Sequence, residues 1–179
     1  MEKMIFDFDP SKCTACQACV MACFDQNDID VECRQHPFRN AAALESVEDG
    51  REKFAFLSVA CMHCEEAPCV MGCPSACLYK DSESGLTLYD NTNCVGCHSC
   101  AMACPFGAPS FNREGKMEKC DGCVERLRRG MMPACVRVCP TGALTCRPAS
   151  EYHEAQTARS LNVLAKHLLE EGPGGPHTT

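Results

Sequence analysis

The sequence contains no tryptophan, and only 6% of its 179 residues are aromatic. Large aromatic side chains usually supply much of the area that a hydrophobic core buries. The sequence also has no stretch of the ~18 consecutive apolar residues that a membrane-spanning helix requires. We therefore expect a soluble domain whose core depends on something other than aromatic packing.

Targeting signals and positive charge are also scarce. Residues 1–7 contain neither an apolar run that could act as a signal peptide nor a twin-arginine pair. We expect the protein to be made in the reducing cytoplasm, and to leave it only if exported with a signal-bearing partner. The formal net charge of −7 argues against nucleic acid as a partner, because binding phosphates needs clustered positive charge.

Cysteine is the abundant residue, with 19 in the sequence. This density is typical of disulfide scaffolds, zinc sites or iron–sulfur clusters. Sixteen of the cysteines fall into four groups of four. The first group is Cys13, Cys16, Cys19 and Cys23, the second is Cys61, Cys64, Cys69 and Cys73, the third is Cys94, Cys97, Cys100 and Cys104, and the fourth is Cys120, Cys123, Cys135 and Cys139.

The four groups form an internal repeat. Groups one and three share the spacing C-x-x-C-x-x-C-x-x-x-C, whereas group two has a wider middle gap and group four an eleven-residue insert. Groups two and four both end in Cys-Pro. Repetition at this level indicates that one structural unit is used four times.

The spacing favours cubane [4Fe–4S] clusters. Three closely spaced cysteines can bind three corners of a cubane, and in two-cluster ferredoxins the fourth cysteine binds the other cluster. Zinc ribbons use two C-x-x-C pairs, which leaves the third and fourth cysteines of these groups without a role. A disulfide framework fits neither the odd count nor a reducing compartment. We predict four [4Fe–4S] clusters, which would take the net charge to roughly −15 at about −2 per cluster.

Three cysteines and two histidines remain outside the predicted ligand set. Cys77 follows the Cys-Pro of the second group, at a position where the fourth group has an alanine, so we expect a small buried residue. We assign no ligand role to Cys33 or Cys146. His63 and His98 lie between ligands, and we expect both to face solvent because each group already has four thiolates.

Three cations also lie near predicted ligands. Lys12 and Lys119 precede the first cysteines of groups one and four, and Arg137 lies between two cysteines of group four. Cations close to a cluster would favour its reduced, more negative state. Side chains that point to solvent are the alternative, and the sequence leaves both open.

The connecting segments predict short strands and one long helix. Residues 5–8, 54–59, 78–80, 86–89, 110–112, 116–118 and 143–145 have strand character, and 5–8 and 143–145 could pair. Short helical turns should carry the last two cysteines of each group. Leu161, Leu164, Ala165, Leu168 and Leu169 share one face of a helix that begins at Ser150 as N-cap. Either the protein's own core or a partner must cover that face.

Five stretches carry a resemblance to a known family: FDPSKC at 8–13, CMHCEEAPC at 61–69, CPFGAP at 104–109, KMEKCDGC at 116–123 and CPTGA at 139–143. From about residue 6 to 147 the sequence resembles the iron–sulfur subunit of the dimethyl sulfoxide reductase family of molybdenum or tungsten enzymes. Some relatives have tryptophan in place of a third-group cysteine and hold a [3Fe–4S] cluster there. Cysteine at all four positions here implies a full cubane.

The resemblance implies an α+β fold with two ferredoxin-like halves of the bacterial 2[4Fe–4S] type. One half, residues 1–23 and 105–147, would hold the clusters of groups one and four. The other, residues 54–104, would hold those of groups two and three. Residues 24–53 would be an insert, 148–171 a C-terminal helix and 172–179 a flexible tail.

The same resemblance implies how the groups share ligands. Each cluster would take three cysteines of one group and the last cysteine of its paired group. The implied sets are Cys13, Cys16, Cys19 and Cys139; Cys120, Cys123, Cys135 and Cys23; Cys61, Cys64, Cys69 and Cys104; and Cys94, Cys97, Cys100 and Cys73. Electrons would pass along the sets in that order, with the first set facing the catalytic partner.

The implied function is electron transfer without catalysis by this protein. It would connect a molybdopterin catalytic subunit to a quinol-linked membrane subunit or a soluble donor or acceptor. A polyferredoxin subunit of a hydrogenase or carbon monoxide dehydrogenase system is the alternative. A reactive or sensing cluster is disfavoured, because sixteen ligands for sixteen cluster corners leave no iron without a protein ligand.

Overall fold

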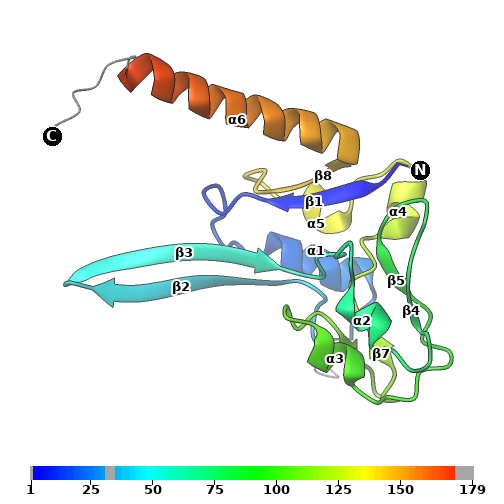
Figure 1. Ribbon diagram of the computed structural model, residues 1–179. Helices are drawn as coiled ribbons and strands as arrows, with labels where there is room; N and C mark the ends of the chain where they lie inside the picture. Colours follow the sequence, from blue (N-terminus) through cyan, green and yellow to red (C-terminus); the bar gives the residue numbers. More distant parts are fainter. Residues whose placement is uncertain (1, 31–34, 172–179) are drawn as a thin grey trace, which may run out of the picture.

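The computed structural model describes residues 2–30 and 35–171, so Cys33 lies outside the described residues. The fold mixes short strands with short helices and ends in one long helix (Figure 1). The strands are β1 (Met4–Phe8), β2 (Asn40–Glu48), β3 (Arg51–Val59), β4 (Leu78–Lys80), β5 (Thr87–Tyr89), β6 (Ser110–Phe111), β7 (Met117–Glu118) and β8 (Leu144–Pro148). The helices are α1 (Ala18–Gln26), α2 (Pro68–Met71), α3 (Ser99–Ala103), α4 (Val124–Arg128), α5 (Ala134–Arg137) and α6 (Ala149–Glu171).

Within the described residues, the strands pair into four antiparallel two-stranded sheets. β1 pairs with β8, with Phe8 opposite Leu144, so the two ends of the cysteine-rich region meet as the sequence predicted. β4 pairs with β5 and β6 with β7, each as a hairpin at the predicted place.

The helical turns lie beside the cysteines and bring distant groups together. α1 carries Cys19 and Cys23. By contrast, α2, α3 and α5 each carry one cysteine, and each of these helices ends before the next cysteine of its group. The prediction that every turn carries two cysteines is therefore correct only for α1. α1 packs against α5 and α2 against α3, so group one meets group four and group two meets group three.

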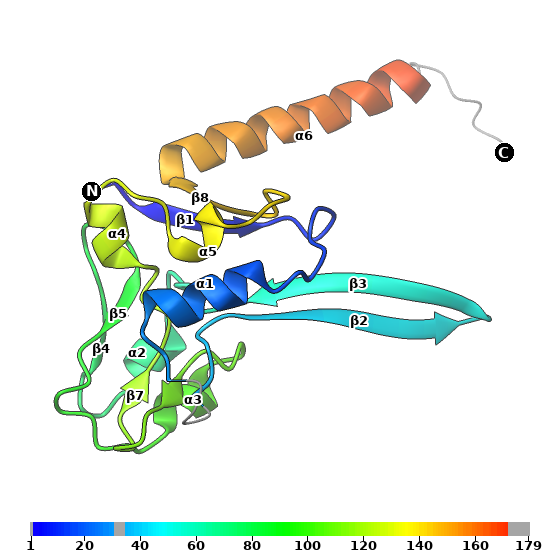
Figure 2. The ribbon, with the colours of Figure 1, turned by 180° about the vertical axis from the view of Figure 1, so that it is seen from behind.

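Residues 24–53 contain most of a long hairpin that the sequence predicted only in part. β2 and β3 pair over nine positions and project from the body of the molecule (Figures 1 and 2). Asp49 and Gly50 form the tip with φ values of 52° and 73°, as a two-residue type I′ turn requires. Side chains along most of both strands are exposed. The period-two apolar pattern of a half-buried strand is therefore missing from β2.

The C-terminal helix forms as predicted but begins one residue earlier. Ser150 lies inside its first turn, so its prediction as N-cap is wrong. The Glu2 carboxylate accepts a hydrogen bond from the Ser150 N–H at 3.1 Å and takes the capping role. α6 contacts β1 and β8, and Leu161, Leu164 and Leu169 are exposed. Within the described residues, no helix is long and apolar enough to cross a membrane.

Cysteines occupy much of the buried interior. One buried cluster joins Cys69 and Cys100 to Ala67, Leu78 and Met117. Another joins Cys19 and Cys135 to Val20 and Leu144. The thiols thus take core positions that aromatic side chains fill in other small domains, which explains how so aromatic-poor a sequence builds its core.

Candidate iron–sulfur sites

The four cysteine groups share a backbone feature that their sequences do not display. The second residue between the first two cysteines is left-handed in every group, with φ of 51° at Ala15, 46° at His63, 64° at Gly96 and 73° at Gly122. Successive backbone N–H groups around such a residue form a concave nest that binds anions, including iron–sulfur clusters. The loops therefore have the shape that an anionic cubane needs.

Backbone N–H groups also point at cysteine sulfurs. Within the loops, Ala15 donates to Cys13 Sγ and Gly122 to Cys120 Sγ, both at 3.4 Å. Other segments supply three more such bonds, from Cys77 to Cys73 Sγ at 3.2 Å, Met117 to Cys94 Sγ at 3.3 Å and Ala108 to Cys104 Sγ at 3.5 Å. Donors of this kind stabilise negative charge on sulfur and tune the potential of a bound cluster.

One cavity lies between groups one and four. Its volume is about 20 Å³, and its cysteines are Cys13, Cys16, Cys19 and Cys139. These are the members of the first predicted set. Two hydroxyls lie near its sulfurs: Ser58 Oγ is 3.4 Å from Cys19 Sγ, and Thr141 Oγ1 is 3.8 Å from Cys139 Sγ.

A second cavity lies between groups two and three. Its volume is about 10 Å³, and its predicted ligands are Cys73, Cys94, Cys97 and Cys100, with Cys77 also in the wall. Ser99 Oγ lies 3.4 Å from Cys97 Sγ, and hydrogen bonds from Ser99 lower the pKa of that thiol. In both cavities the second cysteine, Cys16 or Cys97, is exposed and the third is buried.

The remaining two predicted sets lie deeper. Burial raises the pKa of Cys123 to about 11, and the neighbouring Cys135 and Cys23 add to the rise. Burial likewise raises the pKa of Cys69, with contributions from Cys61 and Cys104. Members of each set are therefore close enough to repel one another as thiolates. None of these eight cysteines is exposed.

The donor sets fit cubane clusters. The cysteines that line each of the two cavities include one complete predicted set of four, which matches the four iron corners of one cubane. Within residues 2–30 and 35–171, no three ligand-type side chains converge as they would on a single metal ion. Thiols whose pKa burial raises are protonated when free, so binding iron at the inner sets would release protons.

His63 is not the solvent-facing residue that the sequence predicted. Its Nδ1 accepts a hydrogen bond from the Thr87 N–H at 3.1 Å, and its Nε2 lies 3.8 Å from Cys120 Sγ. Its ring stacks on Phe6. Burial, followed by the charges of Lys119 and Lys80, lowers the pKa of His63 to about 3. Only the folding of β5 over this loop creates that environment.

The cations divide between the two alternatives left open by the sequence. Lys12 and Arg137 are exposed, and Lys12 pairs with Asp9 at 3.1 Å. Lys119 is buried, with 1% of its surface exposed. Lys80 is a part-buried cation that the sequence did not reveal, because it lies in a strand and not beside a cysteine.

The predictions that Cys77 is buried and that His98 is exposed are both confirmed. Cys77 is buried, and burial raises its pKa to about 11. Cys146 lies in β8 opposite Phe6. His98 is exposed as predicted, and its ring stacks on Phe111 with 3.7 Å between centroids.

Comparison with known proteins adds an independent finding. The sequence family described as "4Fe-4S dicluster domain" matches residues 52–148, and the one described as "4Fe-4S binding domain" matches residues 6–25. The B subunit of the anaerobic dimethyl sulfoxide reductase of Escherichia coli (strain K12) is 40% identical over 152 residues, covering 82% of this sequence and 74% of the relative.

Two further relatives are named for related complexes. The thiosulfate reductase electron transfer subunit of Salmonella typhi is 41% identical over 138 residues, covering 76% of this sequence and 71% of the relative. The nitrate-inducible formate dehydrogenase iron-sulfur subunit of Escherichia coli (strain K12) is 33% identical over 189 residues, covering 94% of this sequence and 64% of the relative.

Proposed function

This protein belongs to the family of iron–sulfur electron-transfer subunits of the dimethyl sulfoxide reductase type, and on that premise we propose that it relays electrons through four [4Fe–4S] clusters. The electrons pass between a molybdopterin catalytic subunit and a quinol-linked membrane subunit or a soluble redox partner. The protein itself binds no substrate and is not catalytic. The relay operates in the cytoplasm, or in another compartment after export with a signal-bearing partner.

The observation that carries the proposal is the pair of cysteine-lined cavities. The cysteines that line them include all four members of the Cys13 set and all four of the Cys94 set. Each set takes its last member from a different group, as shared ligation in two-cluster ferredoxins requires. This supports the full assignment: Cys13, Cys16, Cys19 and Cys139; Cys120, Cys123, Cys135 and Cys23; Cys61, Cys64, Cys69 and Cys104; Cys94, Cys97, Cys100 and Cys73.

The packing supports two ferredoxin-like halves. α1 packs on α5 beside the β1–β8 sheet, which joins groups one and four. α2 packs on α3 and also contacts β4, and the contact between α2 and α3 brings groups two and three together. The β2–β3 hairpin and helix α6 lie outside these two units (Figure 1).

Exposure of the thiols supports the order of the relay. We define the Cys13 and Cys94 sets as the outer sets and the Cys120 and Cys61 sets as the inner sets. Each outer set has one exposed cysteine and the inner sets have none. Cys120 and the His63 ring of the group-two loop lie within 3.8 Å, so the inner sets adjoin. The order is therefore Cys13, Cys120, Cys61, Cys94, with partners docking at the two outer sets.

The residues of the protein hold and tune the clusters. When bound, each cluster takes up and releases one electron without making or breaking bonds to substrate. The sixteen thiolates bind iron, and the backbone N–H groups aimed at Sγ atoms stabilise the added negative charge. Burial of the inner sets keeps water away from the middle of the path.

Co-purification tests the proposed complex. The protein, tagged and expressed anaerobically in its native host, should retain a subunit that contains molybdopterin and molybdenum or tungsten. Recovery of a hydrogenase or carbon monoxide dehydrogenase subunit instead would favour a polyferredoxin role and overturn the proposed partner.

A further inference from the structure

Lys119 is a buried cation beside Cys120, a predicted ligand of one inner set. Its Nζ donates to the Thr87 carbonyl and, at 2.8 Å, to the Cys120 carbonyl. The Tyr89 ring centroid lies 5.8 Å from the same nitrogen. The residue directly precedes Cys120, the first ligand of an inner set, and it reaches across to the hairpin of the group-two half.

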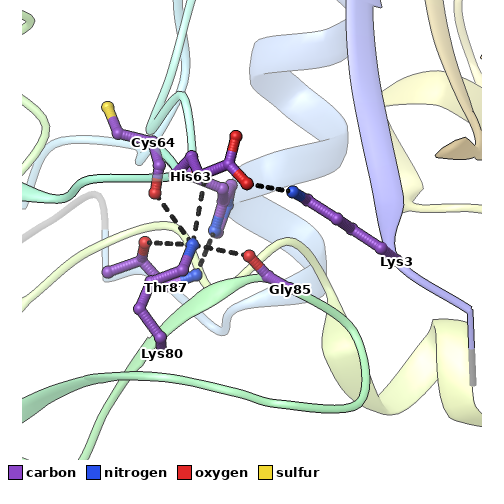
Figure 3. A network of polar contacts seen from close by, with 7 residues as sticks. Lys3, His63, Cys64, Lys80, Gly85 and Thr87 are labelled. Atoms are coloured by element: carbon purple, nitrogen blue, oxygen red, sulfur yellow. Dashed lines mark hydrogen bonds and ion pairs between the residues drawn. The ribbon is translucent and has the colours of Figure 1, made fainter.

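Lys80 approaches the same place from β4. Its Nζ donates to the carbonyls of Gly85 at 2.6 Å and Cys64 at 2.8 Å, and lies 3.3 Å from both the His63 carbonyl and Thr87 Oγ1 (Figure 3). Cys64 belongs to the other inner set. Thr87 contacts both lysines and His63, so the two ammonium groups converge on one residue.

Within the part of the chain that the structure describes, neither ammonium group has an acidic partner. No carboxylate oxygen of residues 2–30 and 35–166 lies within 4.0 Å of Lys80 Nζ or Lys119 Nζ. Glu65 follows Cys64 in the chain, but its side chain is 82% exposed and it pairs with Lys3 at 2.8 Å. A buried charge is strongly unfavourable unless an opposite charge compensates it.

We propose that Lys80 and Lys119 form an internal cationic site that raises the reduction potentials of the two inner clusters. The inference rests on the proposed function, because the clusters supply the negative charge that compensates the lysines. Reduction adds one further negative charge to a cluster, and a nearby fixed cation stabilises the reduced form more than the oxidised form. Carbonyl oxygens fix the ammonium groups but do not neutralise them, so their field reaches the clusters.

The internal repeat provides a matched control. Lys12 precedes the first cysteine of group one as Lys119 precedes that of group four. Lys12 has a side chain that is 54% exposed and is paired with Asp9, so solvent and a carboxylate screen its charge. The variants Lys119→Met, Lys80→Met and Lys12→Met each remove one positive charge and keep a long apolar stem.

Redox titration of the anaerobically prepared protein, followed by electron paramagnetic resonance at low temperature, tests the proposal. In Lys119→Met and Lys80→Met, at least one cluster should show a tenfold or greater fall in its equilibrium constant for reduction, which is about 59 mV for one electron. In Lys12→Met, the midpoint potentials of all four clusters should be unchanged.

The possible outcomes separate the inference from the proposed function. If Lys119→Met and Lys80→Met both keep their full iron content and their midpoint potentials do not change, the inference is overturned and the proposed function is not. Loss of iron from both, with Lys12→Met intact, would assign the lysines a folding role and also overturn it. If one of these two variants fails to fold, the midpoint potentials of the other variant decide whether the inference holds. A wild-type protein that holds no clusters would overturn the proposed function and the inference together.

Discussion

The outer and inner cysteine sets use the same loop in different surroundings. The outer sets line small cavities of about 20 and 10 Å³, each with one exposed thiol. Serine or threonine hydroxyls lie near their sulfurs. The inner sets have no exposed cysteine, and the neighbouring groups include His63 and the buried Lys119. The same sequence repeat therefore gives two kinds of environment.

This difference follows from position in the fold. An end of a relay must let a partner approach, and an exposed thiol brings a cluster edge near the surface. The middle of the relay needs insulation from water, and loss of water raises the free energy of every negative charge placed there. In the proposed relay, the buried Lys119 and the part-buried Lys80 would offset that rise near the inner sets, whereas solvent would serve the same purpose at the outer sets.

Loss of one cysteine ligand should affect the inner sets more strongly than the outer sets. Cys135→Ser removes a buried inner ligand on α5, which packs on α1, so we expect little folded protein to accumulate. Cys97→Ser removes an exposed outer ligand, so the protein should remain soluble and lose about one to four iron atoms, the content of one cubane. Soluble yield and iron analysis measure both effects.

Cys146→Ser is the control for ligand loss, because that thiol lies in β8 near Cys135 and Cys123 but outside the proposed sets. It should keep the full iron content. A Cys146 variant that loses iron while the Cys97 variant keeps it would contradict the ligand assignment.

The two outer loops can be compared at their left-handed residue. A Cβ at Gly96 would lie 2.7 Å from the Gly115 carbonyl oxygen, at a φ of +64°, so Gly96→Ala should destabilise the holoprotein by at least about 1–2 kcal/mol. Ala15→Gly at the equivalent position should change stability by no more than about 0.5 kcal/mol, because relief of left-handed strain offsets the backbone entropy of glycine.

Urea titration of cluster absorbance, carried out anaerobically, measures these two changes. Equal midpoints for Gly96→Ala and wild type would show that the left-handed loop geometry is not needed to hold a cluster.

Removal of α6 should have the smallest effect on either region. The helix contacts only the β1–β8 sheet among the principal element contacts of the described residues, and truncation after Pro148 costs the Glu2–Ser150 cap, typically about 1 kcal/mol. Iron content should stay at the wild-type value. A truncated protein that loses iron from the outer sets alone would show that α6 supports them.

Cysteine spacing predicted the repeated loops of the candidate sites better than it predicted the surroundings of those loops. Short spacing fixes local loop geometry, and strands 5–8 and 143–145 indicated which groups meet. The burial of Lys119 and His63 could not be predicted, because both depend on Thr87 of β5, a strand distant in sequence. Only the second strand of the β2–β3 hairpin was predicted, because the solvated faces of the hairpin carry no alternating apolar pattern. The pair Asp49-Gly50 was nevertheless a signal for a hairpin turn.

Metal and sulfide analysis of anaerobically purified protein is the decisive measurement for the four-cluster relay. Four cubanes predict about 16 iron and about 16 acid-labile sulfide per molecule, with no stoichiometric zinc. A value near 12 iron, or zinc in stoichiometric amount, would contradict the four-cluster relay.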